Sequence, residues 1–282
     1  MKNLSKRQIV ILFSLSLLTA IPGCGIKAGS HLDAKYQRTD EQQSPLEPGS
    51  TIFVETSFGS INIKGSDSNQ CSVTADITVK APTEAEAKQI AARVSIKLDK
   101  AGNKLVISVN KPRINNNRSI AVSFDISIPR KTNIKCNTSY GSIKLSDITG
   151  SINAQTSFAA IAGSNLDGTI LLKTSYGGIT CNNITSSKFT AYSNFGSIGV
   201  DFSTLSPADL NANLNTSYGS VSVVTPPNFA GQLELDTNLG SIKIDRPITV
   251  TGELSKEKII AQLGQGAGKI VVKTSFGAIN LR

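Results

Sequence analysis

A short phrase, Thr-Ser-aromatic-Gly-Ser-Ile, recurs along this chain of 282 residues. Complete copies occupy Thr56–Ile61 and Thr138–Ile143. Related copies are centred on Ala159, Gly177, Gly196, Gly219, Gly240 and Gly277. The first spacing is 82 residues, and the later ones are 18, 18, 19, 23, 21 and 37 residues. A repeat of about 20 residues predicts small units that bury their apolar faces only by stacking on one another.

The alternation of apolar and polar residues around each glycine predicts two strands joined by a corner. Five residues before the glycine the side chain is apolar, and three residues before it the side chain is Thr or Ser. After the glycine, the second and fourth residues are the apolar ones, as in Ile61 and Ile63. The inward set therefore changes phase across the Ser-aromatic-Gly step, which we call the corner. We expect glycine to supply a positive φ at this corner.

Each unit is therefore expected to contain a strand, a corner, a second strand and a polar return such as Ser146–Gly150. Eighteen residues are too few for a strand–helix–strand crossover, but they fit one coil of a single-stranded parallel β-helix. We predict an all-β solenoid with coils of about 18–23 residues. Eight coils would stack to about 38 Å at ~4.8 Å per strand. A β-sandwich is the alternative, since short strands with turn signals also fit it.

The 82-residue gap predicts an N-terminal capping block over residues 50–130, followed by regular coils over 131–282. Within the block, Thr83 and Glu86 have capping-box spacing and predict one short helix. Further strands are expected at 71–79, 94–98, 104–109 and 122–128. Near the C-terminus, Gly264–Gly268 links a strand near 259–263 to the last one, at 269–281. No Lys-Ser/Thr follows these glycines, so we expect a hairpin turn rather than a phosphate-binding loop.

The first residues predict export and lipid attachment. Basic residues precede an apolar run at 9–20, and Ile21-Pro22-Gly23-Cys24 resembles a bacterial lipobox. The run is short for a membrane-spanning helix, so residues 1–23 are interpreted as a lipoprotein-type signal peptide and Cys24 as the lipidated residue. Pro22 is uncommon in a lipobox, which leaves ordinary secretion as the alternative. Gly25, by resemblance to outer-membrane lipoproteins, favours the outer membrane in a cell with two membranes. Residues 24–49 are expected to form the lipidated Cys and a flexible tether.

Composition argues against a nucleic-acid partner. The chain has 29 basic and 20 acidic residues, and three of the basic ones lie in the leader. The remaining net charge of +6 is spread along the chain rather than clustered. The expected partners are a membrane, through the N-terminal lipid, and an unknown protein or glycan surface. End-to-end self-association is left open.

The sequence offers no catalytic constellation. Cys71, Cys136 and Cys181 fall on inward positions, so we expect buried free thiols rather than a disulfide framework. The single histidine, His31, lies in the predicted tether. Asp147 and Asp167 occupy returns that Asx turns explain, and Asp125 lies on an outward position. We therefore predict no enzyme activity, no catalytic residue, no metal and no cofactor.

One set of side chains merits a functional hypothesis. An aromatic ring precedes the glycine in six copies and Ala159 in a seventh, and Leu239 replaces the ring once. On stacked coils the rings would form a column along one edge: Phe58, Tyr140, Phe158, Tyr176, Phe195, Tyr218 and Phe276. If exposed, this column could contact sugars or a partner's apolar surface. Alternation from the inward Thr position favours the other interpretation, a ladder that packs inside.

The chain from about Thr51 to Arg282 resembles the bacterial putative adhesin family, a group of unknown function related to head GIN domains. The resemblance rests on the repeated phrase, the capped helix after Thr83, the step at 126–129 and the ending at 272–279. It implies a right-handed β-helix-like stack and a surface role, and it brings no catalytic residues. Our leading hypothesis is a non-enzymatic, lipid-anchored envelope protein that presents its solenoid surface for adhesion or for contact with a protein or glycan. The alternatives are a carbohydrate-active β-helix enzyme, or a self-assembling or stress-sensing scaffold with a free strand edge at 279–282.

Overall fold

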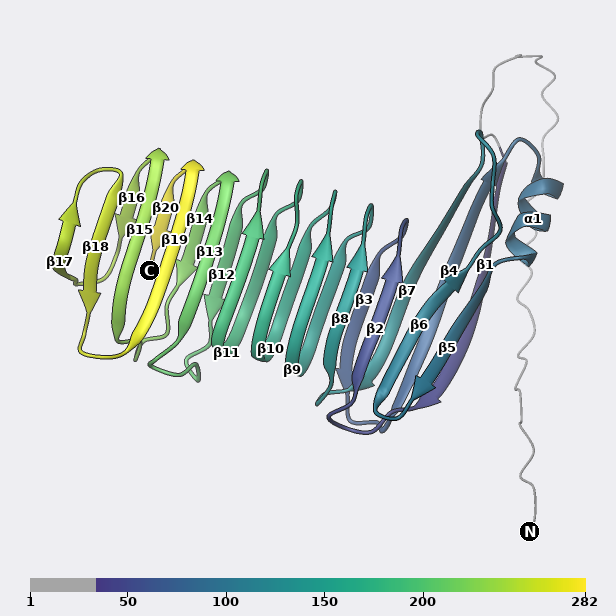
Figure 1. The fold of residues 1–282 in the computed structure, drawn as a ribbon, viewed down its shortest axis with the longest axis horizontal. Helices are drawn as coiled ribbons and strands as arrows, with labels where there is room; N and C mark the ends of the chain where they lie inside the picture. Colours follow the sequence, from purple (N-terminus) through teal and green to yellow (C-terminus); the bar gives the residue numbers. More distant parts are fainter. Residues whose placement is uncertain (1–33) are drawn as a thin grey trace, which may run out of the picture. The chain divides into compact units, whose positions relative to one another are not determined.

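The structure, a computed structural model, describes residues 34–282 (Figure 1). The predicted signal peptide, Cys24, His31 and the first part of the predicted tether lie outside these residues. The described part is almost entirely β, with one helix, α1 (Glu84–Ala92). The strands of the N-terminal half are β1 (Ala34–Pro45), β2 (Thr51–Thr56), β3 (Ile61–Ser66), β4 (Gln70–Ala81), β5 (Ser95–Ala101), β6 (Lys104–Asn110), β7 (Ser119–Pro129), β8 (Asn133–Thr138), β9 (Ile143–Thr156) and β10 (Ile161–Lys173). Those of the C-terminal half are β11 (Ile179–Ser193), β12 (Ile198–Phe202), β13 (Asn211–Tyr218), β14 (Val221–Val224), β15 (Gly231–Leu239), β16 (Ile242–Ile244), β17 (Thr249–Leu254), β18 (Lys258–Leu263), β19 (Gly268–Phe276) and β20 (Ile279–Leu281).

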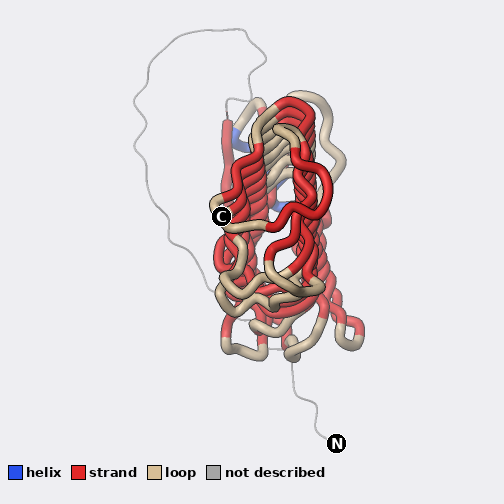
Figure 2. Tube along the Cα trace, turned by 90° about the vertical axis from the view of Figure 1, so that its left-hand side faces the viewer, coloured by secondary structure: helices blue, strands red, loops and turns tan. Residues whose placement is uncertain are grey.

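The repeats pair in parallel, each shifted by one unit. Ile143 of β9 pairs with Ile161 of β10, which pairs with Ile179 of β11. The three long strands bend in the middle, so each contributes to two layers of strands, which Figure 2 shows along the stack. The first layer runs β5–β6–β2–β8–β9–β10–β11–β13–β19–β15–β18–β17. The second runs β1–β4–β7–β3–β9–β10–β11–β12–β14–β20–β16.

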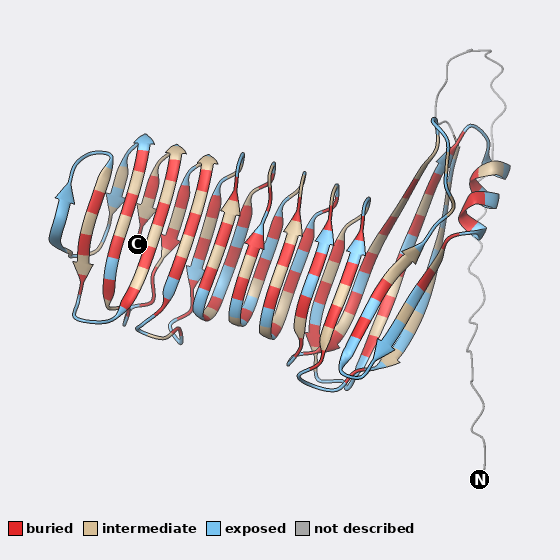
Figure 3. Cartoon of the chain, viewed as in Figure 1, coloured by how far each residue is buried: buried red, intermediate tan, exposed pale blue. Residues whose placement is uncertain are grey.

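The core lies between the two layers and consists of ladders of equivalent residues. Buried and exposed residues alternate along the strands, as the banding in Figure 3 shows. Ile61 and Ile143 are buried on the second layer, and Ile152 and Ile170 on the first. The inward set changes phase across the corner as the sequence predicts, because the residues on both sides of it face the same narrow interior.

The bends opposite the corners carry a ladder of amide and carboxylate groups. Asp147, Asn165 and Asn183 have φ values of 60°, 52° and 54°, in the left-handed region that Asn and Asp tolerate. The Asn165 amide donates to Asp147 over 2.8 Å, and the Asn183 amide donates to Asn165 over 2.8 Å. Asp147 therefore has a structural role in the return, consistent with the turn interpretation.

The capping block follows the local sequence signals. The predicted strands are present as β4, β5, β6 and β7, and the predicted helix is α1. The Thr83 hydroxyl accepts a hydrogen bond from the Glu86 backbone N–H over 3.3 Å, as a helix cap should. Ala87, Ile90 and Ala91 bury one face of α1 against the core. This helix covers the N-terminal end of the stack.

Part of the predicted tether is wrong, because Ala34–Pro45 is the strand β1. It pairs antiparallel with β4 along its whole length. Its residues are mostly polar because it lies at the edge of a layer, so the apolar alternation that marks a strand in the sequence is weak here. Two of its side chains hold the end of α1 and the strand after it: the Arg38 guanidinium donates to the carbonyls of Ala91 and Val94, and the Gln42 amide to that of Ile96.

The C-terminal coils do not stack in sequence order. The last strand pair, β19 and β20, lies between the coil of β13 and β14 and the coil of β15 and β16. A free strand edge at 279–282 would have favoured the self-assembling scaffold, but β20 pairs on both sides, with β14 and with β16. The expected hairpin at Gly264–Gly268 is wrong: β18 and β19 do not pair but lie on opposite sides of β15. The glycine-rich link passes from one side of that strand to the other (Figure 1).

Candidate functional site

Seven aromatic rings form a column along the corner edge of the stack. In spatial order they are Phe58, Tyr140, Phe158, Tyr176, Phe195, Tyr218 and Phe276. Neighbouring ring centroids are 4.7–5.0 Å apart and the ring planes are within 4° of parallel. Each ring is 45–55% exposed. We call this set the aromatic column.

The inward packing expected for these rings is wrong. The chain already turns at the corner, so strand alternation no longer determines where the aromatic side chain points. Leu239, the one aliphatic residue at this position, is 63% exposed and follows Phe276 at the end of the column. The faces of the rings are covered by their neighbours, so the column presents mainly ring edges and, from every second coil, a tyrosine hydroxyl.

A buried hydroxyl ladder holds the corners in place. The hydroxyl of Thr156 donates to the Gly141 carbonyl of the preceding coil over 2.9 Å, and Ser193 donates to Gly177 over 2.9 Å. The same bond occurs from Thr138, Thr174, Thr216, Thr237 and Thr274. These bonds explain the Thr or Ser of the repeated phrase, because a corner carbonyl needs a donor that no strand supplies.

The corner glycines are needed mainly for close approach of the backbone. A Cβ at Gly141 would collide with the carbonyl of Gly59, and one at Gly177 with that of Ala159. Of the corner glycines only Gly59 has a positive φ, of 129°, so the expectation of a positive φ at every corner is wrong. The glycine lets consecutive corners stack at the spacing of the rings.

A polar groove runs beside the column on the first layer, across β8 to β11. It has a volume of about 540 Å³. Its lining consists of Asn137, Gln155, Thr156, Ser157, Lys173, Thr174, Ser175, Tyr192 and Asn194. The lining contains amides, hydroxyls, one ammonium group and one tyrosine ring, and no carboxylate. The ammonium of Lys173 lies 5.6 Å from the centroid of the Tyr192 ring, a cation–π distance. We call this feature the polar groove.

The sequence reasoning did not find this groove. Its main residues stand four positions before each corner, where the sequence pattern shows only a polar outward residue. The types of these outward residues carried the signal, because parallel pairing of neighbouring coils places Asn137, Gln155, Lys173 and Tyr192 next to one another.

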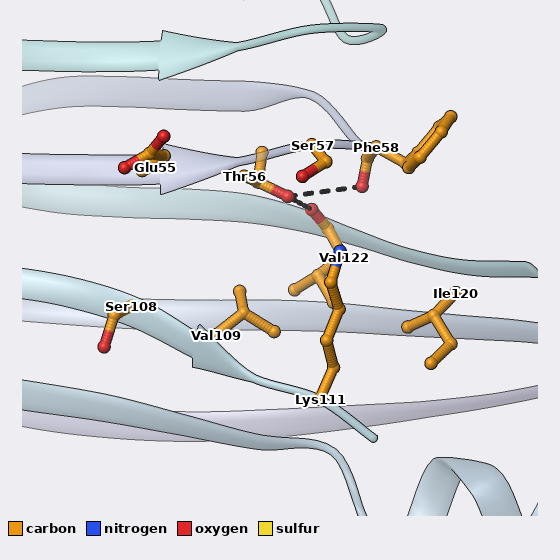
Figure 4. Close-up of a pocket in the computed structure, with 9 residues that line it drawn as sticks. All are labelled: Glu55, Thr56, Ser57, Phe58, Ser108, Val109, Lys111, Ile120 and Val122. Carbon is orange, nitrogen blue, oxygen red and sulfur yellow. Dashed lines mark hydrogen bonds between the residues drawn. The ribbon is translucent and has the colours of Figure 1, made fainter. Parts of the chain in front are cut away.

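A second, smaller cleft lies at the N-terminal end of the column. It has a volume of about 220 Å³. Phe58, Val109, Ile120 and Val122 give it apolar walls, and Glu55 and Lys111 give it charged ones (Figure 4). The Thr56 hydroxyl, which begins the hydroxyl ladder, lies on its wall and is 3.3 Å from the carbonyls of Phe58 and Val122.

Glu55 and Lys111 of the smaller cleft form no ion pair within residues 34–282, and the lining of the polar groove contains no carboxylate. Glu234 accepts a hydrogen bond from Lys273, which lowers the pKa of this carboxyl, the opposite of what a general acid requires. Asp125 is exposed and accepts a 2.7 Å bond from the Asn62 amide. Within the same residues no group of three or more His, Cys, Asp or Glu side chains could hold a metal ion.

The three cysteines of the described chain are free and buried, as the sequence predicts. Burial raises the pKa of Cys71, Cys136 and Cys181 from 9.0 to about 12. Such thiols stay protonated at neutral pH and behave as small apolar side chains. They belong to the core and not to a site.

Comparison with known proteins gives one family and several distant structures. The Toastrack DUF4097 family matches residues 49–282. No curated protein matches the chain. A putative cell adhesion protein from Clostridium sporogenes is 13% identical with a TM-score of 0.34, over 86% of this chain and 99% of its own. A putative adhesin from Bacteroides fragilis is 12% identical with a TM-score of 0.35, over 87% of this chain and 97% of its own. These likenesses are too distant to assign an activity. Among residues 34–282, no helix is long and apolar enough to cross a membrane.

Proposed function

The chain belongs to the Toastrack DUF4097 family, and from this premise we propose that it is a non-enzymatic binding protein of the cell envelope. In this proposal the coils wind as a right-handed β-helix, the usual hand for a strand that returns to a parallel neighbour in the same layer. The solenoid presents one long edge for adhesion to a protein or glycan surface. The observation that carries the proposal is the aromatic column.

The aromatic column is a continuous exposed apolar strip, which is typical of an interaction surface. Seven rings, each about half exposed, form one continuous apolar strip across seven coils. Contiguous apolar patches on soluble proteins commonly mark interaction sites, and aromatic residues are enriched at such sites. The rings are already held by their neighbours, so little side-chain entropy is lost when a partner binds.

Export and lipid attachment complete the proposal. Residues 1–23 act as the signal peptide and Cys24 carries the lipid, which places the solenoid at the membrane surface. The membrane is the outer one in a cell with two membranes, and secretion without lipid is the alternative. These steps rest on the leader sequence alone.

The enzyme alternative lacks a supporting observation. A β-helix that hydrolyses polysaccharides generally needs two carboxylates that converge on one groove. The polar groove has none in its lining, and the smaller cleft has only Glu55. The groove residues therefore suit binding better than hydrolysis.

Ring removal tests the role of the column. We expect the full chain to bind at least one purified envelope polysaccharide or surface protein, and Tyr140→Ser with Tyr176→Ser to weaken that binding by more than about tenfold, or 1.4 kcal/mol. The matched control is Leu205→Ser, which removes an 80% exposed apolar side chain outside the column. The pair Tyr140→Phe and Tyr176→Phe keeps the stack and reports on the hydroxyls alone.

The same experiment can overturn the proposal. Equal binding by the double variant Tyr140→Ser with Tyr176→Ser and by the Leu205→Ser control would exclude the column from the contact surface. Reproducible turnover of any polysaccharide would remove the non-enzymatic assignment. Far-UV circular dichroism checks that the double tyrosine-to-serine variant is folded, since each lost stacked pair costs about 0.5–1.5 kcal/mol.

A further inference from the structure

The polar groove contains hydrogen-bonding groups that the protein itself does not use. The side chains of Asn137, Asn194 and Lys173 make no hydrogen bond or ion pair with any of residues 34–282. Asn137 and Lys173 are exposed on the first layer and lie two coils apart. An amide offers both a donor and an acceptor, which is what a pair of neighbouring sugar hydroxyls can satisfy.

The spacing of the groove residues suits an extended chain that lies along the stack. One outward side chain comes from each of β8, β9, β10 and β11, and neighbouring coils are ~4.8 Å apart. That distance is close to the length of one sugar residue, so successive sugars of a polymer can meet successive coils. Tyr192 is outside the aromatic column and stacks on no other ring of residues 34–282. The Lys173 ammonium lies over its ring, and a sugar could lie on the part of the ring that the ammonium leaves uncovered.

The charge of the groove favours an acidic chain. Lys173 is the only charged residue in its lining. The ammonium of Lys135, on β8 and two coils from Lys173, lies 5.9 Å from the Phe53 ring and likewise has no ion pair in the described chain. At the C-terminal end of the same layer the arrangement is different, because Glu234 pairs with Lys273 over 2.8 Å and with Lys269 over 3.7 Å.

Other ligand classes fit the groove less well. A nucleic acid would need more phosphate-binding cations than the one or two present. A protein partner would need a buried apolar anchor in the groove, and its lining is mostly polar. We therefore propose that the polar groove binds an acidic polysaccharide whose uronate carboxylate pairs with Lys173 and whose hydroxyls bond to Asn137, to Asn194 and to the Oε1 of Gln155. The Nε2 of Gln155 already donates to Asn153 over 3.0 Å, so its oxygen is the atom that faces the ligand in this proposal. The inference rests on the proposed binding function and names its ligand class.

The test uses the full chain and polygalacturonate, a polymer of uronic acid, in isothermal titration calorimetry. Lys173→Gln is expected to weaken binding about tenfold or more, the size of a lost charge-assisted hydrogen bond. The matched control is Lys273→Gln, which removes the same charge at the equivalent position of β19, where Glu234 already pairs with it. We expect this control to leave the affinity unchanged.

Two further probes separate the sugar from its charge. Fully methyl-esterified polygalacturonate keeps the sugar and removes the carboxylate, so we expect it to bind as weakly to the wild type as polygalacturonate binds to Lys173→Gln. Polyglutamate keeps the charge without the sugar, and we expect it to bind far more weakly than polygalacturonate. Equal binding of polyglutamate, or equal affinities of the two lysine variants for polygalacturonate, would overturn the proposal.

The outcome also separates this inference from the proposed function. If polygalacturonate does not bind while loss of the column rings still weakens an envelope contact, the acidic-polysaccharide site is wrong and the binding function stands. If the chain binds polygalacturonate and Tyr140→Ser with Tyr176→Ser leaves that affinity unchanged, the groove is a site independent of the column. If neither surface binds any probe, both proposals fail.

Discussion

Removal of one hydroxyl from the buried ladder should measurably destabilise the solenoid. Ser193 is 4% exposed, and its hydroxyl donates over 2.9 Å to the carbonyl of Gly177, which is itself buried. That carbonyl receives no other hydrogen bond from residues 34–282. In Ser193→Ala the packing changes by one atom, while the carbonyl is left without a donor. An unpaired buried polar group costs about 1–3 kcal/mol.

The assay is urea unfolding of the full chain, followed by far-UV circular dichroism. A thermal scan provides a second readout. In a domain of this size, a loss of 2 kcal/mol in the free energy of unfolding lowers the midpoint temperature by about 4–8 °C. Ser193→Thr is the matched restoring variant, because Thr occupies the equivalent position in the adjacent coils, at Thr174 and Thr216. It keeps the donor and adds a buried methyl, so we expect no loss and a gain of up to about 0.8 kcal/mol.

An outward hydroxyl supplies the negative control. Thr180 is exposed on β11, and its side chain makes no hydrogen bond in the described chain. We expect Thr180→Val to change the free energy of unfolding by less than about 0.5 kcal/mol. If Ser193→Ala also changes the free energy of unfolding by less than about 0.5 kcal/mol, the hydroxyl ladder does not stabilise the corners. The recurring Thr or Ser of the repeat would then need another explanation.

Two further predictions concern the core and the corner. Burial holds the pKa of Cys136 and Cys181 at about 12 in the fold against 9.0 for a free thiol, so the folded chain keeps protons that the unfolded chain releases. The free energy of unfolding should therefore be insensitive to these thiols below pH 9 and fall above it, by about 1.4 kcal/mol per pH unit for each thiol. Urea titrations across this pH range should show a smaller decline when both are alanine, and an equal decline would contradict the assignment. At the corner, Gly141→Ala should cost about 1–3 kcal/mol in the same titrations because its Cβ collides with Gly59. Gly199→Ala, with open space around the new Cβ, should be neutral or stabilising, and equal effects of the two would refute the close-approach argument.

Local signals predicted the parts of the fold that depend on neighbours in sequence. The capping box at Thr83 and the alternation in β4 and β7 specify their elements directly, because cap geometry and strand period act within a few residues. The polar edge strand β1 could not be predicted in this way. Its burial is one-sided and its partner, β4, is distant in sequence, so its own residues carry little of the information.

The candidate site depends on the corners and on the stacking of coils, and neither can be predicted from the alternation of inward and outward residues along a strand. The rings of the column were expected inside because the strand period was extended through the corner, where the backbone no longer follows it. The groove was missed because Asn137 and Lys173 are unremarkable one at a time. They make a surface only after parallel stacking brings neighbouring coils together.

The spatial order of the coils could not be predicted from the repeats either. The coils share one inward pattern, so this pattern does not specify which coils are neighbours. The aromatic column holds a signal that distinguishes the orders. In sequence order Leu239 would separate Tyr218 from Phe276 and leave five ring–ring contacts. With β19 and β20 inserted, Tyr218 stacks on Phe276 at 4.8 Å, the column has six stacked pairs, and Leu239 stands at its end.

The additional stacked pair is worth about 0.5–1.5 kcal/mol, enough to favour the inserted order by itself. The insertion also makes Phe and Tyr alternate without a break, so that tyrosine hydroxyls recur every second coil, about 10 Å apart. A ring at the end of the column would have one face without a stacking partner. Leucine has no ring, so it loses no stacking interaction there. The position of β19 and β20 between the two neighbouring coils therefore continues both the buried apolar ladders and the exposed aromatic column. The surface proposed to bind a partner is built by the order of the last two coils as much as by the residues of the repeat.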